Sequence, residues 1–97
     1  MLTQYIIREA VLAVAPQYEI DEVYLFGSYA RGDATEDSDC DLRIVGGDMR
    51  SLFDLGGLHE DLADTLGTQI DLVLTKNISK EFYSLIKDEE VMVYAKI

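Results

Sequence analysis

The sequence predicts a small α/β (α+β) fold, in which a mixed β-sheet is flanked by helices. Stretches with apolar residues at helical spacing alternate along the chain with short stretches of strand-forming residues. Glycine or proline ends several of these stretches. Hydrophobic residues make up 48% of the 97 residues, which is enough for a packed core, so residues 1–97 are expected to form a single domain.

The first predicted element is an amphipathic helix over residues 3–15. Its apolar side chains recur at three and four residues, the spacing of one helical face, and Pro16 ends the run. The apolar residues 23–26 are then expected to form a buried strand that ends at Gly27. A polar loop over residues 33–38 follows.

A second strand is expected over residues 39–45, where polar and apolar side chains alternate. One face would carry Asp39, Asp41 and Arg43, and the other Cys40, Leu42 and Ile44. A strand with one solvent-exposed face requires this alternation, and Gly46-Gly47 ends it.

A leucine-rich helix is expected next, with Asp48 as its N-cap and Gly67 as its C-terminal stop. Gly56-Gly57 weakens this helix midway. The leucines at helical spacing are Leu52, Leu55, Leu58, Leu62 and Leu66.

A third strand is expected over residues 69–74, with Asp71 on the face away from the core. Ser79 can cap a last helix, which an acidic run (residues 88–90) and an apolar stretch (residues 91–95) follow. Because three strands make a thin sheet, the apolar stretch or a partner is expected to complete it. The strand would direct Ile70, Leu72 and Leu74 toward the core, and the helix carries Phe82, Leu85 and Ile86.

Charge and composition narrow the classes of function. Nineteen acidic and eight basic residues give a formal net charge of −11, which repels phosphate backbones and disfavours direct nucleic-acid binding. The same charge would attract Mg²⁺ and a basic protein partner, although an acidic surface also serves solubility alone. The single Cys40 cannot form an internal disulfide, and no run approaches the roughly 18 apolar residues of a membrane helix. With no secretory signal at the start, a cytoplasmic location is expected.

Three aspartates form the pattern that points to chemistry. Asp39 and Asp41 would project from one strand face about 6.5–7 Å apart, close enough to share a hard cation such as Mg²⁺. If the Asp71 strand neighbours theirs, three acids converge as ligands for one or two Mg²⁺ ions that hold a nucleotide triphosphate. Asp39 and Asp41 would then hold metal and phosphates. Asp71 would complete the second metal site and favour deprotonation of an attacking hydroxyl.

Gly27-Ser28 follows the first strand directly and is expected to bind phosphate. The glycine lets the backbone approach a ligand, and Ser28 and the following amides can donate hydrogen bonds to phosphate oxygens. If Ser28 opens a short helix, the positive end of that helix and Arg31 would offset the charge of a triphosphate.

Each piece also has a simpler structural explanation. A Gly-Ser after a strand is usually a turn, and paired aspartates in an acidic protein are usually a solvated face. The spacing of Asp37, Asp39 and Asp41 also suggests a calcium loop, but Leu42 stands where that loop needs glycine. Asp71 is the hardest to dismiss, because an acid in mid-strand is disfavoured without a partner or ligand.

Together these residues resemble the minimal nucleotidyltransferase (MNT) type of the DNA polymerase β-like nucleotidyltransferases. The family pattern is Gly-Ser, a spacer of ten residues, Asp-x-Asp and a later third aspartate; here these are Gly27-Ser28, residues 29–38, Asp39-Cys40-Asp41 and Asp71. Cys40 stands where an aliphatic residue is common. The resemblance implies the nucleotidyltransferase fold, binding of ATP with two Mg²⁺ ions, and transfer of a nucleoside monophosphate to a hydroxyl while pyrophosphate leaves.

Larger members of this family, such as the antibiotic adenylyltransferases, carry a helical domain that binds the acceptor, and this chain has no residues left for one. The chain is similar to the antitoxins of HEPN/MNT toxin–antitoxin pairs, in which the MNT protein adenylylates a tyrosine of the HEPN ribonuclease. This implies an antitoxin that transfers AMP to a HEPN-type toxin within a heteromeric complex. Two alternatives stay open: an antitoxin that neutralises its toxin by binding alone, and a small-molecule nucleotidyltransferase of the antibiotic type.

Overall fold

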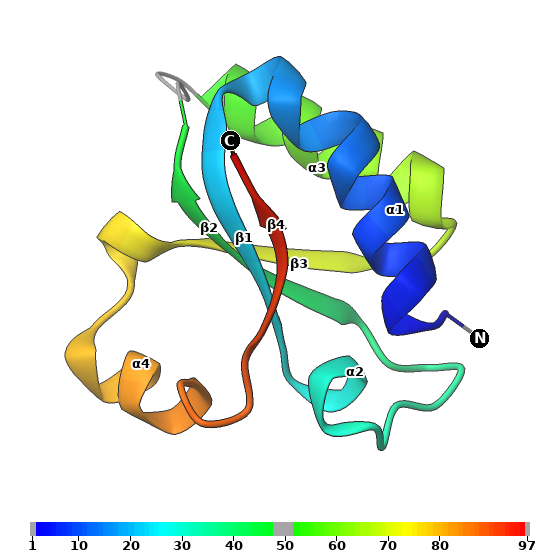
Figure 1. Cartoon of the computed structure of the whole chain (residues 1–97), viewed down its shortest axis with the longest axis vertical. Helices are drawn as coiled ribbons and strands as arrows, with labels where there is room; N and C mark the ends of the chain where they lie inside the picture. Colours follow the sequence, from blue (N-terminus) through cyan, green and yellow to red (C-terminus); the bar gives the residue numbers. More distant parts are fainter. Residues whose placement is uncertain (1, 48–51, 97) are drawn as a thin grey trace.

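The computed structural model describes residues 2–47 and 52–96 and has the predicted α/β (α+β) architecture (Figure 1). Helices and strands follow one another in the order expected from the sequence, with the apolar stretch near the C-terminus as a further strand. In the described part of the chain, no helix is long and apolar enough to cross a membrane.

The centre of the molecule is a mixed four-stranded sheet. Its strands are β1 (Ile20–Phe26), β2 (Cys40–Gly46), β3 (Ile70–Leu74) and β4 (Val91–Ala95). They lie in the order β3-β2-β1-β4, with β1 antiparallel to both β2 and β4, and β2 parallel to β3. The apolar stretch near the C-terminus thus forms β4, the fourth strand that was expected to complete the sheet.

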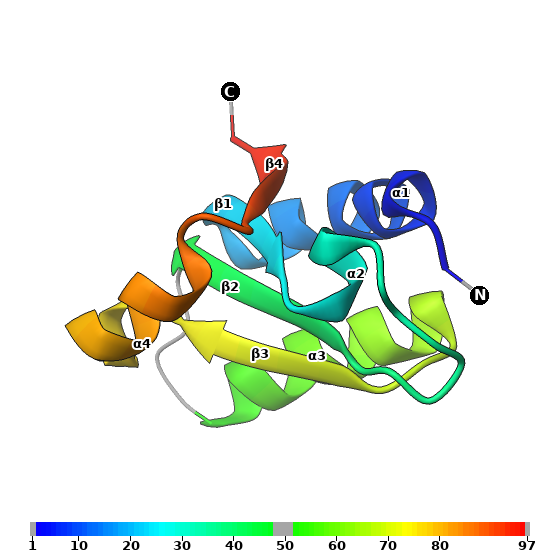
Figure 2. The same ribbon diagram turned by 90° about the horizontal axis from the view of Figure 1, so that it is seen from below.

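Two long helices, α1 (Gln4–Val14) and α3 (Leu52–Leu66), pack against each other and against the sheet (Figures 1 and 2). The apolar faces of these helices pack on the apolar face of the central strands and form one hydrophobic core. Burial of this apolar surface stabilises both layers. The fully buried core side chains include Ile7, Val11, Ile20, Leu25, Leu42, Ile44, Leu58 and Leu62.

A one-turn helix, α2 (Ser28–Arg31), and a two-turn helix, α4 (Lys80–Ile86), complete the helical elements, together with short 3-10 turns at Ala15–Tyr18 and Thr75–Asn77. α4 is set apart from α1 and α3 (Figure 1). Its Phe82 ring meets the Phe26 ring edge-on, with 5.9 Å between the centroids. Since neighbouring residues of a strand face opposite sides, Phe26 lies opposite the core face of β1, and α4 covers part of that opposite face.

Side-chain caps and a glycine define three helix ends, of which those at Ser79 and Gly67 were predicted. The Thr3 hydroxyl accepts a hydrogen bond from Ile6 N at the start of α1, and the Ser79 hydroxyl accepts one from Phe82 N at the start of α4. Gly67, with a φ of 67°, ends α3 in the left-handed conformation. The predicted cap Asp48 lies outside the described residues.

Two expectations about the second strand need correction. The second strand begins at Cys40, so Asp39 immediately precedes it. Arg43 lies on the face predicted to be solvent-exposed, yet only 5% of it is accessible, because α4 and the segment before β4 cover this part of the sheet. In the last helix, α4, Ile86 is buried and Leu85 is 77% exposed.

Candidate active site

Two of the three predicted aspartates lie on adjacent strands, and the third immediately precedes one of these strands. In the parallel pair of β2 and β3, Asp41 and Asp71 are direct neighbours in register. Asp39 lies two residues before Asp41, immediately before β2 begins. The condition that the sequence left open, adjacency of these two strands, is therefore met. Asp39 and Asp71 are exposed and Asp41 is half-buried, so the acids lie on an accessible surface.

Asp41 has an unusual electrostatic environment. Burial, followed by the negative charges of Asp71, Asp39 and Glu89, raises the pKa of its carboxyl group to about 6, while the charge of Arg31 opposes this rise. A carboxylate in this position gains from a cation that neutralises the shared charge. The electrostatics thus fit a site for a divalent metal ion.

Gly27 gives Asp41 the space that it occupies. Phe26, the last residue of β1, is paired with Asp41 across the sheet, and Gly27 follows at once. A Cβ atom at Gly27 would overlap Asp41 Oδ2, and the glycine has a φ of 75° and a ψ of −155°. Residues with a side chain rarely adopt this conformation. The glycine is therefore required by both the backbone turn and the position of the carboxylate.

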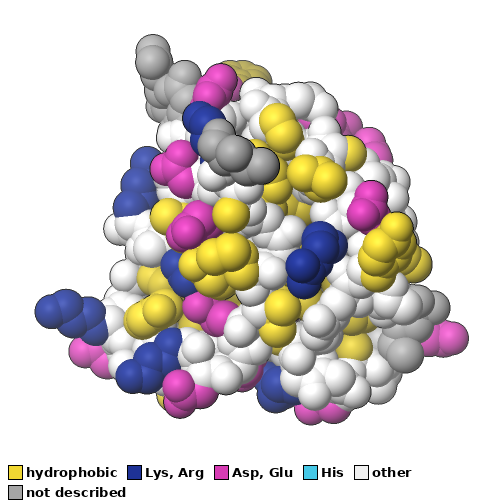
Figure 3. Space-filling view, viewed as in Figure 1, with side chains coloured by type: hydrophobic (Ala, Val, Ile, Leu, Met, Phe, Trp, Pro, Cys, Tyr) yellow, Lys and Arg dark blue, Asp and Glu magenta, His cyan; other side chains and the backbone are white. Residues whose placement is uncertain are grey.

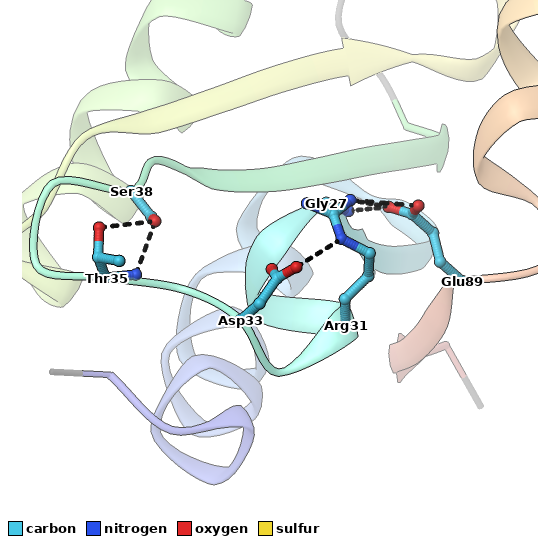
Figure 4. A network of polar contacts seen from close by, with 6 residues as sticks. All are labelled: Gly27, Arg31, Asp33, Thr35, Ser38 and Glu89. Atoms are coloured by element: carbon cyan, nitrogen blue, oxygen red, sulfur yellow. Dashed lines mark hydrogen bonds and ion pairs between the residues drawn. The ribbon is translucent and has the colours of Figure 1, made fainter.

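The predicted phosphate-binding residues surround this turn. Ser28 opens α2, and Arg31 closes it and extends toward two carboxylates (Figure 4). Arg31 Nε donates to Asp33 Oδ2 at 3.2 Å, and Arg31 Nη1 donates to the carboxylate of Glu89 at 3.3 Å. Since α2 is a single turn, its helix dipole is small, and the positive charge near Ser28 comes mainly from the guanidinium group.

Glu89 is a site residue that the sequence pattern did not single out. It lies in the connection between α4 and β4, and its carboxylate also accepts a hydrogen bond from Gly27 N (Figure 4). The available signal in the sequence was the acidic run directly before an apolar strand. That run was indistinguishable from a solvated turn until the fold placed it beside Gly27.

A buried ion pair supports β2 next to the acids. Arg43, two residues after Asp41, donates through Nη2 to Glu90 Oε1 at 2.8 Å and through Nη1 to Thr75 Oγ1 at 2.8 Å. Its guanidinium carbon lies 4.4 Å from the centroid of the Tyr24 ring. The charge is thus fully paired within the fold, which makes Arg43 a structural group.

The donor set fits a hard divalent cation by its chemistry. Carboxylate oxygens are the preferred ligands of Mg²⁺. Asp41 and Asp71 supply them from paired positions of β2 and β3, and Asp39 lies two residues before Asp41. Across residues 2–47 and 52–96, however, no three acidic, histidine or cysteine side chains form a ready-made metal cluster. The exposed Asp39 and Asp71 side chains would have to turn toward Asp41 when an ion binds.

Comparison with known proteins decides the family. The model of the family described as "Polymerase beta, Nucleotidyltransferase" matches residues 9–96, nearly the whole chain. The chain belongs to this nucleotidyltransferase family. The resemblance and the fold predicted from the sequence are therefore confirmed, and the protein is a nucleotidyltransferase.

Proteins similar to this nucleotidyltransferase include one with a named activity and two of known structure. The protein adenylyltransferase MntA of Thermococcus cleftensis is 34% identical over 77 residues, which are 79% of this chain and 78% of the relative. The structure of a candidate minimal nucleotidyltransferase has a TM-score of 0.76 and 30% identity, and covers 93% of this chain and 95% of that one. A third likeness, at the level of fold, is to a complex of a tri-AMPylated Shewanella oneidensis HEPN toxin with MNT antitoxin. Its TM-score is 0.73 with 19% identity, and it covers 97% of this chain and 74% of that one.

Proposed function

We propose that this nucleotidyltransferase is a Mg²⁺-dependent protein adenylyltransferase that transfers AMP from ATP to a tyrosine hydroxyl of a HEPN-type toxin and acts as its antitoxin. The observation that carries the proposal is the register of β2 and β3, which makes Asp41 and Asp71 neighbours beside Gly27. Nucleotidyl transfer requires acids that bind metal ions and, beside them, a group that binds phosphate. The acid pair and the Gly27 turn would supply these two parts.

Each residue has a distinct part in the proposed reaction. Asp39 and Asp41 hold the metal ions and Asp71 completes the second site, with ATP as substrate. Ser28 and Arg31 donate hydrogen bonds to the triphosphate. The tyrosine oxygen forms a bond to the α-phosphorus as the bond from that phosphorus to the pyrophosphate oxygen breaks. The hydroxyl proton passes toward Asp71, and bound Mg²⁺ supplies charge neutralisation for the phosphates.

Four further observations support a protein acceptor. A relative that is similar over most of its length is named as a protein adenylyltransferase, and a structure of the same fold holds an AMPylated HEPN toxin beside an MNT antitoxin. Asp39 and Asp71 are exposed, so an acceptor side chain on another protein can reach the acids. The net charge of −11 would also favour association with a basic partner.

The test is transfer of labelled AMP from ATP and Mg²⁺ to a HEPN-type protein encoded beside this chain. Asp39→Asn, Asp41→Asn and Asp71→Asn should each lower transfer by about 100-fold or more, because each removes a charged metal ligand. Asp37→Asn is the matched control, since it removes the same charge from an exposed loop residue and should leave transfer intact.

The same variants separate the two alternative functions. Full neutralisation of the toxin by Asp41→Asn, without any transfer, would contradict the catalytic explanation and support an antitoxin that acts by binding alone. Transfer to small hydroxyl-bearing compounds but not to the HEPN-type protein would support the antibiotic-type activity instead.

A further inference from the structure

The connection between α4 and β4 places a carboxylate against the predicted phosphate-binding turn. Glu89 accepts hydrogen bonds from Gly27 N and, through both carboxylate oxygens, from Arg31 Nη1 at 3.3 Å (Figure 4). The Glu89 side chain is 21% exposed, against 48% for Arg31. A residue 62 positions away in the sequence thus contacts both ends of the Gly27–Arg31 turn.

The contact with Gly27 restricts the most flexible residue of the turn. Glycine has no Cβ atom and can rotate freely between many backbone conformations, so a single arrangement must be imposed from outside. The Glu89 carboxylate fixes the direction of the Gly27 N–H, and a hydrogen bond to a charged acceptor is stronger than one to a neutral acceptor. This holds the turn in the form that admits Asp41.

The contact with Arg31 orients a guanidinium group that is otherwise half-exposed. Asp33 accepts from Nε, and Glu89 accepts from Nη1. A guanidinium group has five N–H donors in a fixed plane, so two anchored nitrogens determine where the remaining donors on Nη2 point. Arg31 can therefore bind a phosphate oxygen without first losing the freedom of a long exposed side chain.

We propose that Glu89 is a positioning residue for nucleotide binding, which holds Gly27 and Arg31 in the arrangement that receives the triphosphate. This inference rests on the proposed function. In a chain with a net charge of −11, the Glu89 carboxylate adds electrostatic repulsion near the acids of the site. A neutral residue would serve the fold without this repulsion, so the carboxylate is expected to have a function. The opposite role, a carboxylate that occupies the phosphate position and must be displaced, predicts the opposite effect on affinity.

The experiment measures binding of Mg²⁺ with α,β-methylene-ATP to the full chain by calorimetry. In this analogue a CH₂ group replaces the oxygen of the bond that the proposed reaction breaks. Glu89→Gln keeps an oxygen that can accept from Gly27 N but places an amide against Arg31, and Glu89→Ala removes both contacts. We expect Glu89→Gln to weaken binding by about tenfold and Glu89→Ala by more. Glu81→Gln, the same change at an exposed site on α4, should bind like the wild type.

A second measurement reports the contact without nucleotide or metal. In the amide spectrum of the labelled protein, the Gly27 proton should move upfield in Glu89→Gln and stay unchanged in Glu81→Gln, because the charged acceptor is lost only in the first. An unmoved Gly27 signal in Glu89→Gln would show that the contact is absent in solution and overturn the inference.

The binding outcomes distinguish the two proposals. If the wild type binds the nucleotide and Glu89→Gln binds equally well, the positioning role alone is wrong. Tighter binding by Glu89→Gln would also overturn it, in favour of a carboxylate that competes with phosphate. If the wild type does not bind the nucleotide at all, the proposed function and the inference fail together.

Discussion

Asp41 is a half-buried carboxylate whose pKa lies at about 6 instead of the usual 3.8. A proton therefore binds more tightly in the folded state than in the unfolded state. Above pH 6 the ionised group destabilises the fold, and this cost disappears as the pH falls through 6 toward 3.8. The same ionised form is the one that can bind a metal ion, so stability and metal affinity oppose each other at this residue.

Asp41→Asn should raise the melting temperature of the metal-free protein by about 4 °C at pH 7.5, since it removes the charge that burial disfavours. The difference from the wild type should shrink below pH 6 and be absent near pH 4, which thermal unfolding across this range would measure. Asp37→Asn, at an exposed position, serves as the control. A lower melting temperature for Asp41→Asn at pH 7.5 would contradict this account.

Gly27 and Gly32 offer a matched pair at the residue scale. Both have positive φ, 75° and 88°, but a Cβ atom at Gly27 would overlap Asp41, whereas one at Gly32 would meet nothing within 4 Å. Gly32→Ala should cost about 1 kcal/mol of backbone strain and keep nucleotide binding. Gly27→Ala should lose nucleotide binding by about 100-fold, because the carboxylate must move. Equal binding by the two variants, measured by calorimetry on folded protein, would argue against the steric role.

At the scale of elements, α3 contains two adjacent glycines in an unbroken helix of 15 residues. A Cβ atom at Gly56 would meet nothing within 4 Å, whereas one at Gly57 would lie 3.0 Å from the Tyr18 hydroxyl oxygen. That hydroxyl donates to Asp61 Oδ2 at 2.6 Å and cannot shift without weakening the bond. The contact with Tyr18 therefore favours glycine at position 57, whereas no contact with a described residue restricts the side chain at position 56.

Gly56→Ala should stabilise the protein by about 1 kcal/mol, the difference between alanine and glycine in a helix interior. Gly57→Ala should gain less or lose stability, because the new methyl group crowds Tyr18. Urea denaturation of both variants measures the difference, and an equal gain at the two positions would show that the Tyr18 contact does not restrict α3.

The pair of Arg43 and Glu90 joins β2 to the segment before β4. Both side chains are only 6% exposed, so removal of one partner leaves a buried charge unpaired. Glu90→Gln should lower the free energy of unfolding by about 3 kcal/mol, and Glu81→Gln on the exposed face of α4 should leave it unchanged. Replacement of the pair by Met and Leu together should restore much of the loss. An effect of Glu90→Gln within about 0.5 kcal/mol, the range of surface substitutions, would show that the pair contributes little.

At the scale of the whole molecule, the chain has a net charge of −11. On the face shown in Figure 3, acidic and basic side chains are interspersed with exposed hydrophobic ones. The response to salt can separate general repulsion between the acidic side chains from specific binding of a metal ion. Monovalent ions screen the repulsion, but they do not replace a divalent ion at its site.

Mg²⁺ should raise the melting temperature of the wild type above its value in NaCl of equal ionic strength. The expected excess is about 5 °C at a Mg²⁺ concentration near ten times its dissociation constant. The excess should disappear in Asp41→Asn and remain in Asp37→Asn. An equal response of all three proteins would mean that Mg²⁺ acts through general screening instead of the predicted site.

The sequence by itself determined the elements and the candidates for chemistry. Helical spacing, the Ser79 cap and strand alternation depend on contacts between residues close in the chain. These local rules predicted the longer helices and the three strands β1, β2 and β3. The same local patterns singled out Gly27, Asp39, Asp41 and Asp71 as site residues.

Only the tertiary structure decided which of these elements lie together. The parallel pairing of β2 with β3, which makes Asp41 and Asp71 neighbours, depends on burial of the whole sheet under α1 and α3. The contacts of Glu89 with Gly27 and of Glu90 with Arg43 join residues 62 and 47 positions apart. Because such pairings depend on how all elements share one core, an acidic run that reads locally as a solvated turn becomes part of the candidate site only in the folded molecule.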